Sequence, residues 1–234
     1  MKASLCLALC LVGAASTPLA AAFTSIKFHP DNPLPEFPLV LISDGVSHGE
    51  VVMAIGVSAE GKLTDCLPLA YTHEPFVKAC EDVLRQWKFT PAQVDGASVG
   101  VKVELTFNFE RTGYIESNRM NITKNFISGR QSHRLSQRLI EASQLDSPPR
   151  VVSTVNPIYP RDAKNDGIRG SVRVSFYIDE NGRVRLPSVS SNSHPYLADI
   201  AVDALRSWRF QPATYRGRPA VVAAAQDFRF GMEP

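Results

Sequence analysis

The chain has 234 residues, with 25 basic and 23 acidic side chains and a formal net charge of +2. This even balance, without a basic stripe interleaved with aromatic residues, disfavours a nucleic-acid partner. The sequence has no glycine-rich phosphate loop and no serine in the strand-to-helix context of a nucleophile elbow. It therefore predicts a binding protein without catalytic residues or cofactors, and not an enzyme.

The amino terminus has the pattern of an export signal. Lys2 precedes the apolar run Leu5–Val12, and Ala20–Ala22 supplies small residues at a cleavage site. This arrangement is typical of a secretory signal peptide spanning residues 1–22, with Phe23 as the first residue of the mature chain. The alternative is an uncleaved membrane anchor, and only in that case do we expect a membrane contact.

Two cysteines remain after such a cleavage. In an oxidising compartment Cys66 and Cys80 predict a disulfide. The 14-residue loop that it closes would be stabilised by about 3 kcal/mol in the loop-entropy account. The alternative is a metal site that includes His73, but three ligands at this spacing match no standard zinc pattern. We therefore expect no metal.

The first half of the mature chain has the pattern of a small α+β domain. A proline-rich lead-in at residues 23–46 predicts extended chain. Apolar residues then alternate along 51–57 and return along 62–69, which predicts a β-hairpin. A helical apolar stripe at 76–87 is followed by a further alternating strand at 99–109. We expect the helix to pack against the hairpin.

The pattern lapses over residues 112–150, which are read as a linker. Within it, the spacing of apolar residues over 133–142 is compatible with one amphipathic helix, which ends before Pro148 and Pro149. The alternative interpretation of this segment is an ordered extension of the first domain.

The second half repeats the first, with strands at 172–178, 184–189 and 221–230 and a helix at 196–208. Sliding the chain by 121 positions superposes glycines, aromatic residues and prolines: Gly49 on Gly170, Gly61 on Gly182, Trp87 on Trp208, Phe89 on Phe210, Pro91 on Pro212, Gly96 on Gly217 and Phe109 on Phe230. A register of this length without a gap indicates an internal duplication. The chain therefore predicts two domains, at 23–111 and 151–234.

Aromatic and polar positions within the repeat suggest different roles. Trp87 and Trp208 end the helices beside phenylalanines, so we expect core packing and not ligand stacking. Gln226 replaces Leu105 in the buried register of the last strand. Either this position lies at an open sheet edge or the glutamine has a polar partner.

Several motifs of the second copy occur in a fixed order: Pro-Ile-Tyr-Pro-Arg-Asp-Ala at 157–163, Gly-Ser-Val-Arg-Val at 170–174, Ile-Asp-Glu-Asn-Gly at 178–182, Ala-Leu-Arg-Ser-Trp-Arg-Phe-Gln-Pro-Ala at 204–213 and Phe-Arg-Phe at 228–230. Together they resemble the carboxy-terminal domain of the TonB family, and residues 35–109 resemble a more diverged member. The resemblance implies an α+β fold of two tandem small domains. Each would be a three-stranded antiparallel sheet with a helix packed on one face.

The resemblance also implies a partner, because family members add an extended peptide box of an outer-membrane receptor beside their last strand. An edge strand suits this task because its unpaired backbone groups bind almost any extended peptide. On this basis the strand supplies five candidate partner-binding residues: Val221, Ala223, Ala225, Gln226 and Asp227. The lead-in that matches the family's Gln-Pro-x-Tyr-Pro segment supplies four more: Asn156, Pro157, Tyr159 and Pro160.

The chain departs from a family energy transducer in two ways. Its signal looks cleavable, and its proline-rich lead-in is short where a transducer has a long spacer. We therefore expect an exported, periplasmic protein-binding module whose two domains gain avidity if both engage. One alternative is a structural module that associates with itself through its edge strands. Another is a true transducer anchored in the inner membrane and facing the periplasm.

Overall fold

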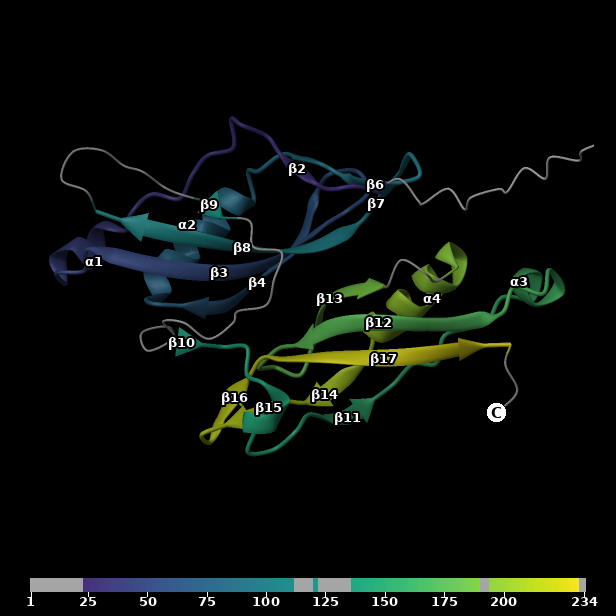
Figure 1. Cartoon of the computed structure of the whole chain (residues 1–234). Helices are drawn as coiled ribbons and strands as arrows, with labels where there is room; N and C mark the ends of the chain where they lie inside the picture. The colour runs from purple at the N-terminus through teal and green to yellow at the C-terminus, as the bar shows by residue number, and fades with distance from the viewer. Residues whose placement is uncertain (1–22, 112–119, 122–135, 190–193, 232–234) are drawn as a thin grey trace, which may run out of the picture.

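The computed structural model describes residues 23–111, 120–121, 136–189 and 194–231. They form two α+β units of the same plan, joined by a linker and packed against each other (Figure 1). The first unit contains, in chain order, β1 (Phe23–Thr24), β2 (Lys27–Phe28), α1 (Leu39–Ser43), β3 (His48–Val57), β4 (Leu63–Tyr71), α2 (Glu74–Leu84), β5 (Phe89–Thr90), β6 (Ala92–Val94), β7 (Ala97–Val99) and β8 (Val101–Glu110).

The linker contributes β9 (Met120–Asn121), β10 (Ser136–Gln137) and a 3-10 turn at Ala142–Gln144. The second unit contains β11 (Arg150–Ser153), α3 (Arg161–Asn165), β12 (Gly170–Ile178), β13 (Val184–Val189), α4 (Pro195–Arg206), β14 (Arg209–Gln211), β15 (Ala213–Tyr215), β16 (Arg218–Ala220) and β17 (Val222–Phe230). Among these described residues no helix is long and apolar enough to cross a membrane.

The predicted α+β fold is confirmed in both units. The main sheets are antiparallel, with strand order β4-β3-β8 at the centre of the first and β13-β12-β17 in the second. Each has one long helix on one face, where α2 buries Phe76 and Leu84 and α4 buries Leu197 and Leu205. In the first unit the linker strands β9 and β10 extend the sheet to five strands.

Both tryptophans lie in the cores, as predicted, with exposed fractions of 6% for Trp87 and 8% for Trp208. Each indole also anchors the lead-in of its own domain. Nε1 of Trp87 donates to the carbonyl of Pro33 at 2.7 Å, and Nε1 of Trp208 donates to that of Val155 at 2.9 Å. Because a buried indole N–H needs an acceptor, the core tryptophan fixes where the lead-in runs.

The lead-ins differ from the extended chain that the sequence predicts, because each contains a short helix. Pro38 precedes α1 and Pro160 precedes α3, with φ angles of −64° and −65°. The proline ring holds this angle, which suits the entry to a helix. Leu41 of α1 and Ala163 of α3 are the buried residues of these helices, so each helix packs one apolar side chain against its domain.

The linker helix proposed over 133–142 is not present in residues 136–142, which are extended apart from the start of the 3-10 turn. The N–H groups of Arg138 and Leu139 both donate to the carbonyl of Leu69. Pairing with the sheet edge thus satisfies backbone groups that a helix would have satisfied internally. Tertiary contacts outweigh a weak local helical pattern here.

The two domains meet through the sheet faces that carry no helix. Besides the core of each domain, a third apolar cluster contains residues from both domains: Val52, Ala54, Leu67, Leu69, Ala70, Tyr177, Leu186 and Val221. Leu186 lies at an irregularity in the pairing of β12 with β13 and has a φ of +50°. A Cβ added to Gly56 of β3 would lie 2.9 Å from Cδ2 of Leu186. The bulged leucine therefore fits where the opposing strand has no side chain.

Polar groups reinforce this interface. Arg185 of β13 donates to both carboxylate oxygens of Asp65 on β4, at 2.8 and 2.6 Å, and to the carbonyl of Cys66 at 2.9 Å. The Tyr177 hydroxyl donates to Glu104 at 2.8 Å, and Lys102 lies 4.7 Å from the centre of the Tyr177 ring. Burial beside the Glu104 carboxylate raises the pKa of Tyr177, so its hydroxyl stays a donor.

Candidate functional site

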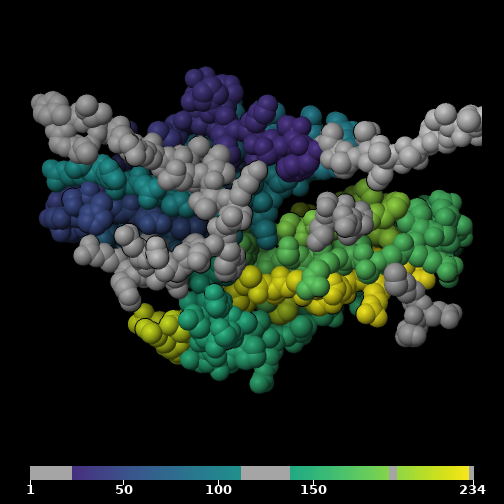
Figure 2. All heavy atoms as spheres, in the orientation of Figure 1, coloured from purple at the N-terminus to yellow at the C-terminus, as the bar shows by residue number. Residues whose placement is uncertain are grey.

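β17 is the edge strand of the second domain's sheet. It pairs with β12 without interruption, from Gly170 opposite Phe230 to Ile178 opposite Val222. Its atoms form a yellow stripe along the visible surface in Figure 2. Side chains alternate along it between a helix-facing set, including Val222 and Phe228, and an exposed set. The strand thus presents one paired edge and one side on which a further strand could be added.

The start of this edge is occupied by the linker. The N–H of Val221 donates to Arg138, and the carbonyl of Val221 accepts from Ile140, each at 2.9 Å. Val221 is also fully buried between the domains. The predicted partner-binding residue Val221 therefore has its backbone groups and side chain engaged within the molecule.

The Val221 bonds also show which residues of β17 face outward. Successive residues in a strand direct their N–H and C=O groups to opposite sides. Since those of Val221 face the linker, the outward groups along the remainder of the edge belong to every second residue: Ala223, Ala225, Asp227 and Arg229. These four side chains are exposed on the helix-free face of the sheet. Three of them were predicted as partner-binding residues, and Arg229 was missed.

Gln226 both lies at a sheet edge and has a polar partner, the two alternatives that the sequence left open. It lies in the helix-facing register of an edge strand, and its Nε2 donates to the carbonyl of Asp227 at 3.0 Å. That carbonyl is one of the outward groups, so the glutamine covers one acceptor of the edge. A strand added at this edge must either displace the Gln226 side chain or leave the Asp227 carbonyl bonded to it.

The equivalent edge of the first domain is engaged inside the protein. The register of 121 places Lys102, Glu104 and Thr106 of β8 at the positions of Ala223, Ala225 and Asp227. Lys102 and Glu104 contact Tyr177 across the domain interface, and Thr106 pairs with Asn121 of β9. The two copies have therefore diverged, and the second retains the more open edge.

The lead-in lies at the far end of β17. The ring of Tyr159 packs 5.8 Å from that of Phe230, and its hydroxyl donates to the carbonyl of Ile168 at 2.6 Å. The hydroxyl is thus used within the domain. Asn156 is exposed, Pro157 and Pro160 are half-buried, and the neighbouring Ile158 is 83% exposed. The structure brings Tyr159 to the strand end, whereas Ile158, not predicted as a site residue, has the more accessible side chain.

The disulfide predicted between Cys66 and Cys80 is not formed in the structure, where both are free thiols. Cys80 of α2 is fully buried in the first core, and Cys66 of β4 packs against the same cluster. Burial raises the pKa of both thiols. Because the thiolate is the reactive species, this environment slows oxidation of either cysteine.

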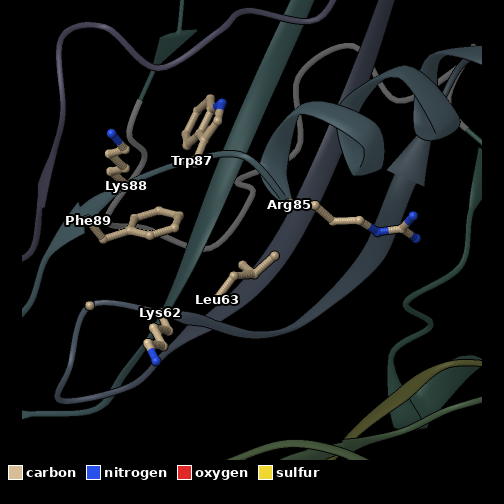
Figure 3. Close-up of a pocket in the computed structure, with 7 residues that line it drawn as sticks. Lys62, Leu63, Arg85, Trp87, Lys88 and Phe89 are labelled. Atoms are coloured by element: carbon tan, nitrogen blue, oxygen red, sulfur yellow. The ribbon is translucent and has the colours of Figure 1, made fainter.

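A pocket of about 520 Å³ lies in the first domain beside Trp87, Phe89 and Leu63. Three basic residues also line it, but in Figure 3 Arg85 points away from the two aromatic rings. Lys62 and Lys88 extend from different segments on the other side, so the charges do not converge. Binding of one small ligand normally needs convergent polar groups in an apolar cavity. The pocket is therefore a poorer candidate site than the sheet edge.

One serine does occur in a Gly-x-Ser-x-Gly stretch, at Ser98 between Gly96 and Gly100. It is exposed on β7, which pairs with β6 and continues into β8. A nucleophile elbow instead places its serine between a strand and a helix. Among the described residues there is also no cluster of three or more side chains able to hold a metal ion.

Residues 34–110 and 155–232 each match the family of the Gram-negative bacterial TonB protein C-terminal region. The chain belongs to this family. The two matched segments are in tandem and correspond to the two α+β units of the structure.

Parts of this chain are similar to known proteins. Protein TonB of Vibrio cholerae is 31% identical over 90 residues, which are 38% of this chain and 37% of that protein. Protein TonB of Pseudomonas aeruginosa is 35% identical over 78 residues, covering 33% of this chain and 23% of that protein. The chain thus spans well under half the length of these relatives. The solution structure of the Pseudomonas aeruginosa TonB C-terminal domain is 30% identical, covers 40% of this chain and 94% of that one, and has a TM-score of 0.33.

Proposed function

We propose that this protein is an exported, periplasmic binding module that contacts outer-membrane TonB-dependent receptors by strand addition to β17. The observation that carries the proposal is the edge itself. Ala223, Ala225, Asp227 and Arg229 direct their backbone groups outward beyond the linker contact at Val221. An extended peptide gains affinity from such groups and specificity from the side chains on alternate positions. The protein acts by binding and not as an enzyme.

We propose one docking edge, on the second domain, in place of one peptide site on each domain. In the first domain, Lys102 and Glu104 at the equivalent positions contact Tyr177, and Thr106 pairs with β9. In this account it serves as a platform that fixes the second domain, and avidity between two peptide sites plays no part. The lead-in from Asn156 to Pro160 adds a second contact beside the end of β17, where Tyr159 packs on Phe230.

Proline at Ala225 tests this edge. Its missing N–H is one of the outward groups, so the ladder with β12 keeps its bonds while the added peptide loses one. We expect binding of a receptor plug domain, or of its peptide box, to weaken by about tenfold, from one lost hydrogen bond and a clash with the proline ring. Calorimetric titration measures the affinity, and circular dichroism checks that the fold is kept.

The matched control is Ala59→Pro in the first domain. Ala59 follows Ser58 in a turn closed by the bond from the Gly61 N–H to the Ser58 carbonyl, a position where proline is favoured. This variant is expected to bind normally. Unchanged binding by the Ala225→Pro variant would contradict docking at β17. Failure of the unaltered protein to bind any receptor, together with reversible dimers that Ala225→Pro abolishes, would support the structural role instead.

The export hypothesis has its own test. The mature protein recovered from fractionated cells is expected to begin at Phe23 and to lie in the periplasmic fraction. Mass spectrometry of the intact protein with amino-terminal sequencing decides this. An intact Met1 in the inner-membrane fraction would make the protein an anchored transducer.

A further inference from the structure

Exposed apolar side chains are concentrated in one short stretch of the second domain. Of the nine large apolar residues that are exposed in the described part of the chain, four lie within residues 151–158: Val151, Val152, Val155 and Ile158. Their exposed fractions range from 49% to 83%. In Figure 1, β11 at the start of this stretch lies on the side of the second domain that faces away from the first. The stretch with its two flanking arginines, residues 150–161, is called the valine-rich lead-in below.

The fold does not require these exposed apolar residues. β2 in the first domain and β11 in the second pair with equivalent strands, β5 and β14. After β2, however, the exposed residues are prolines, the polar residues His29, Asp31 and Glu36, and one leucine, Leu34. The same lead-in thus forms in the first domain without a run of exposed valine and isoleucine. A contact outside the domain explains why the second copy has one.

The exposed residues of the valine-rich lead-in follow one another at intervals of three, at Val152, Val155 and Ile158. Pro157 and Pro160 confine their own φ angles and hold the residues before them in extended chain. Pro160 has a φ of −65° and a ψ of 146°, values close to polyproline II. A chain of that type has three residues per turn. The spacing therefore favours one apolar row along the lead-in.

Arginines flank this row. Arg150 begins β11, Arg161 begins α3, and Arg209 of β14 stands opposite Ser153 of β11. All three arginines are exposed, and none forms an ion pair with any residue that the structure describes. One acidic residue, Asp162, follows Arg161 in the chain. The apolar row is therefore bordered mainly by positive charge.

The net charge of the domain limits what can cover this surface. Residues 150–231 contain 12 basic and 7 acidic side chains, a net of +5, whereas residues 23–111 contain 7 basic and 12 acidic side chains, a net of −5. A second copy seated on the valine-rich lead-in through its own lead-in would bring like charges together, which is unfavourable. A stable protein–protein interface uses about 20–30 residues on each side, more than this short stretch supplies. An anionic surface that needs no matching shape fits both the charge and the size.

We infer that the valine-rich lead-in is a site at which this protein contacts an anionic phospholipid membrane surface. Its apolar row enters the boundary between headgroups and acyl chains, and its arginines lie among the headgroup phosphates. Arginine suits this position because its planar fork pairs with phosphate oxygens. This contact goes beyond the function proposed above and does not depend on strand addition at β17. It also needs no uncleaved signal, because the lead-in is part of the mature chain.

Co-sedimentation with lipid vesicles tests the inference. The protein used begins at Phe23, so that the apolar run Leu5–Val12 cannot contribute. Vesicles of phosphatidylcholine alone are compared with vesicles that contain about one third phosphatidylglycerol. The partition coefficient is expected to be about tenfold higher for the anionic vesicles, and the difference should shrink at about 0.5 M salt. Equal partitioning into the two kinds of vesicle, or none into either, overturns the inference.

The apolar part is tested by the variant with Val152→Asn and Ile158→Asn. Both side chains are exposed, so the fold should be kept, which circular dichroism checks. Partitioning into anionic vesicles is expected to fall by about tenfold, because two apolar side chains no longer leave water. The matched control replaces Leu39 and Val40 of α1 with asparagine, since these residues are equally exposed but belong to the acidic domain. A loss as large in the control overturns the inference.

The charged part is tested by the variant with Arg150→Gln and Arg161→Gln, which is expected to lose most of the preference for anionic over neutral vesicles. Lys27→Gln with Lys62→Gln is the control, because it removes the same charge from exposed positions of the first domain. Equal effects of the two double variants would mean that net charge alone drives binding, which overturns the assigned site. Concentration-dependent dimers that Val152→Asn abolishes, without vesicle binding, would instead identify a second copy as the occupant. Since the vesicles contain no receptor, none of these results bears on docking at β17.

Discussion

Replacing Arg185 with methionine is expected to lower the free energy of unfolding by about 2 kcal/mol. The guanidinium group joins the domains through two bonds to Asp65 and one to the Cys66 carbonyl, and it lies 3.4 Å from the Asp179 carboxylate. Asp179 is 4% exposed. Without the arginine its buried charge keeps, among the described residues, hydrogen bonds from the backbone N–H groups of Asn181 and Arg183. Removing one partner of a buried pair costs more than the pair contributes.

A double-mutant cycle isolates the part that crosses the interface. Arg185→Met, Asp65→Asn and the double variant are compared by urea unfolding, and a coupling energy of about 1 kcal/mol or more is expected. Arg206→Met is the control, because its exposed pair with Asp203 contributes a few tenths of a kcal/mol at most. Additive effects of Arg185→Met and Asp65→Asn would mean that the domains are not joined at this point.

The contact between the two domains could not be predicted from the sequence. The hairpin, helix and last strand of each repeat follow from local periodicity, whereas the edge position of β17 was implied only by the family resemblance. The interface depends on pairs distant in sequence, such as Arg185 with Asp65. One signal was nevertheless present in β3, where Val52 and Ala54 alternate with the core-facing Val51 and Met53. A strand that is apolar on both sides is typical of burial on both faces.

The linker was the least predictable segment. β10 consists of two residues, and the bonds of Arg138 and Ile140 connect to Leu69 and Val221, one in each domain. Local sequence gives no sign of such short pairings, because their stability comes from the edges that they meet. The candidate site was affected directly. The sequence predicted Val221 to be part of an open edge strand, but its backbone groups bond to the linker. The direction of these bonds also indicates that Arg229 is one of the residues whose backbone groups point outward.

The second large effect is expected at Gly182, in the turn between β12 and β13. Its φ is +72°, and a Cβ would lie 1.8 Å from the carbonyl oxygen of Phe210. The left-handed conformation alone costs a non-glycine residue about 1 kcal/mol. The clash must in addition move β14 and break the bond from the Phe210 N–H to the Gly182 carbonyl, which is 2.9 Å long. Gly182→Ala should therefore lower the free energy of unfolding by about 3 kcal/mol.

The chain supplies its own control for this substitution. Gly217 has nearly the same φ, +71°, but an added Cβ there meets nothing within 4 Å. Gly217→Ala is thus expected to cost only the conformational part, about 1 kcal/mol. The first domain repeats the comparison, since a Cβ at Gly61 would lie 2.3 Å from the Phe89 carbonyl oxygen while Gly96 is open. Urea unfolding of the four alanine variants separates backbone strain from close packing. Equal losses at Gly182 and Gly217 would show that the approach of Phe210 to the turn is not a constraint on the fold.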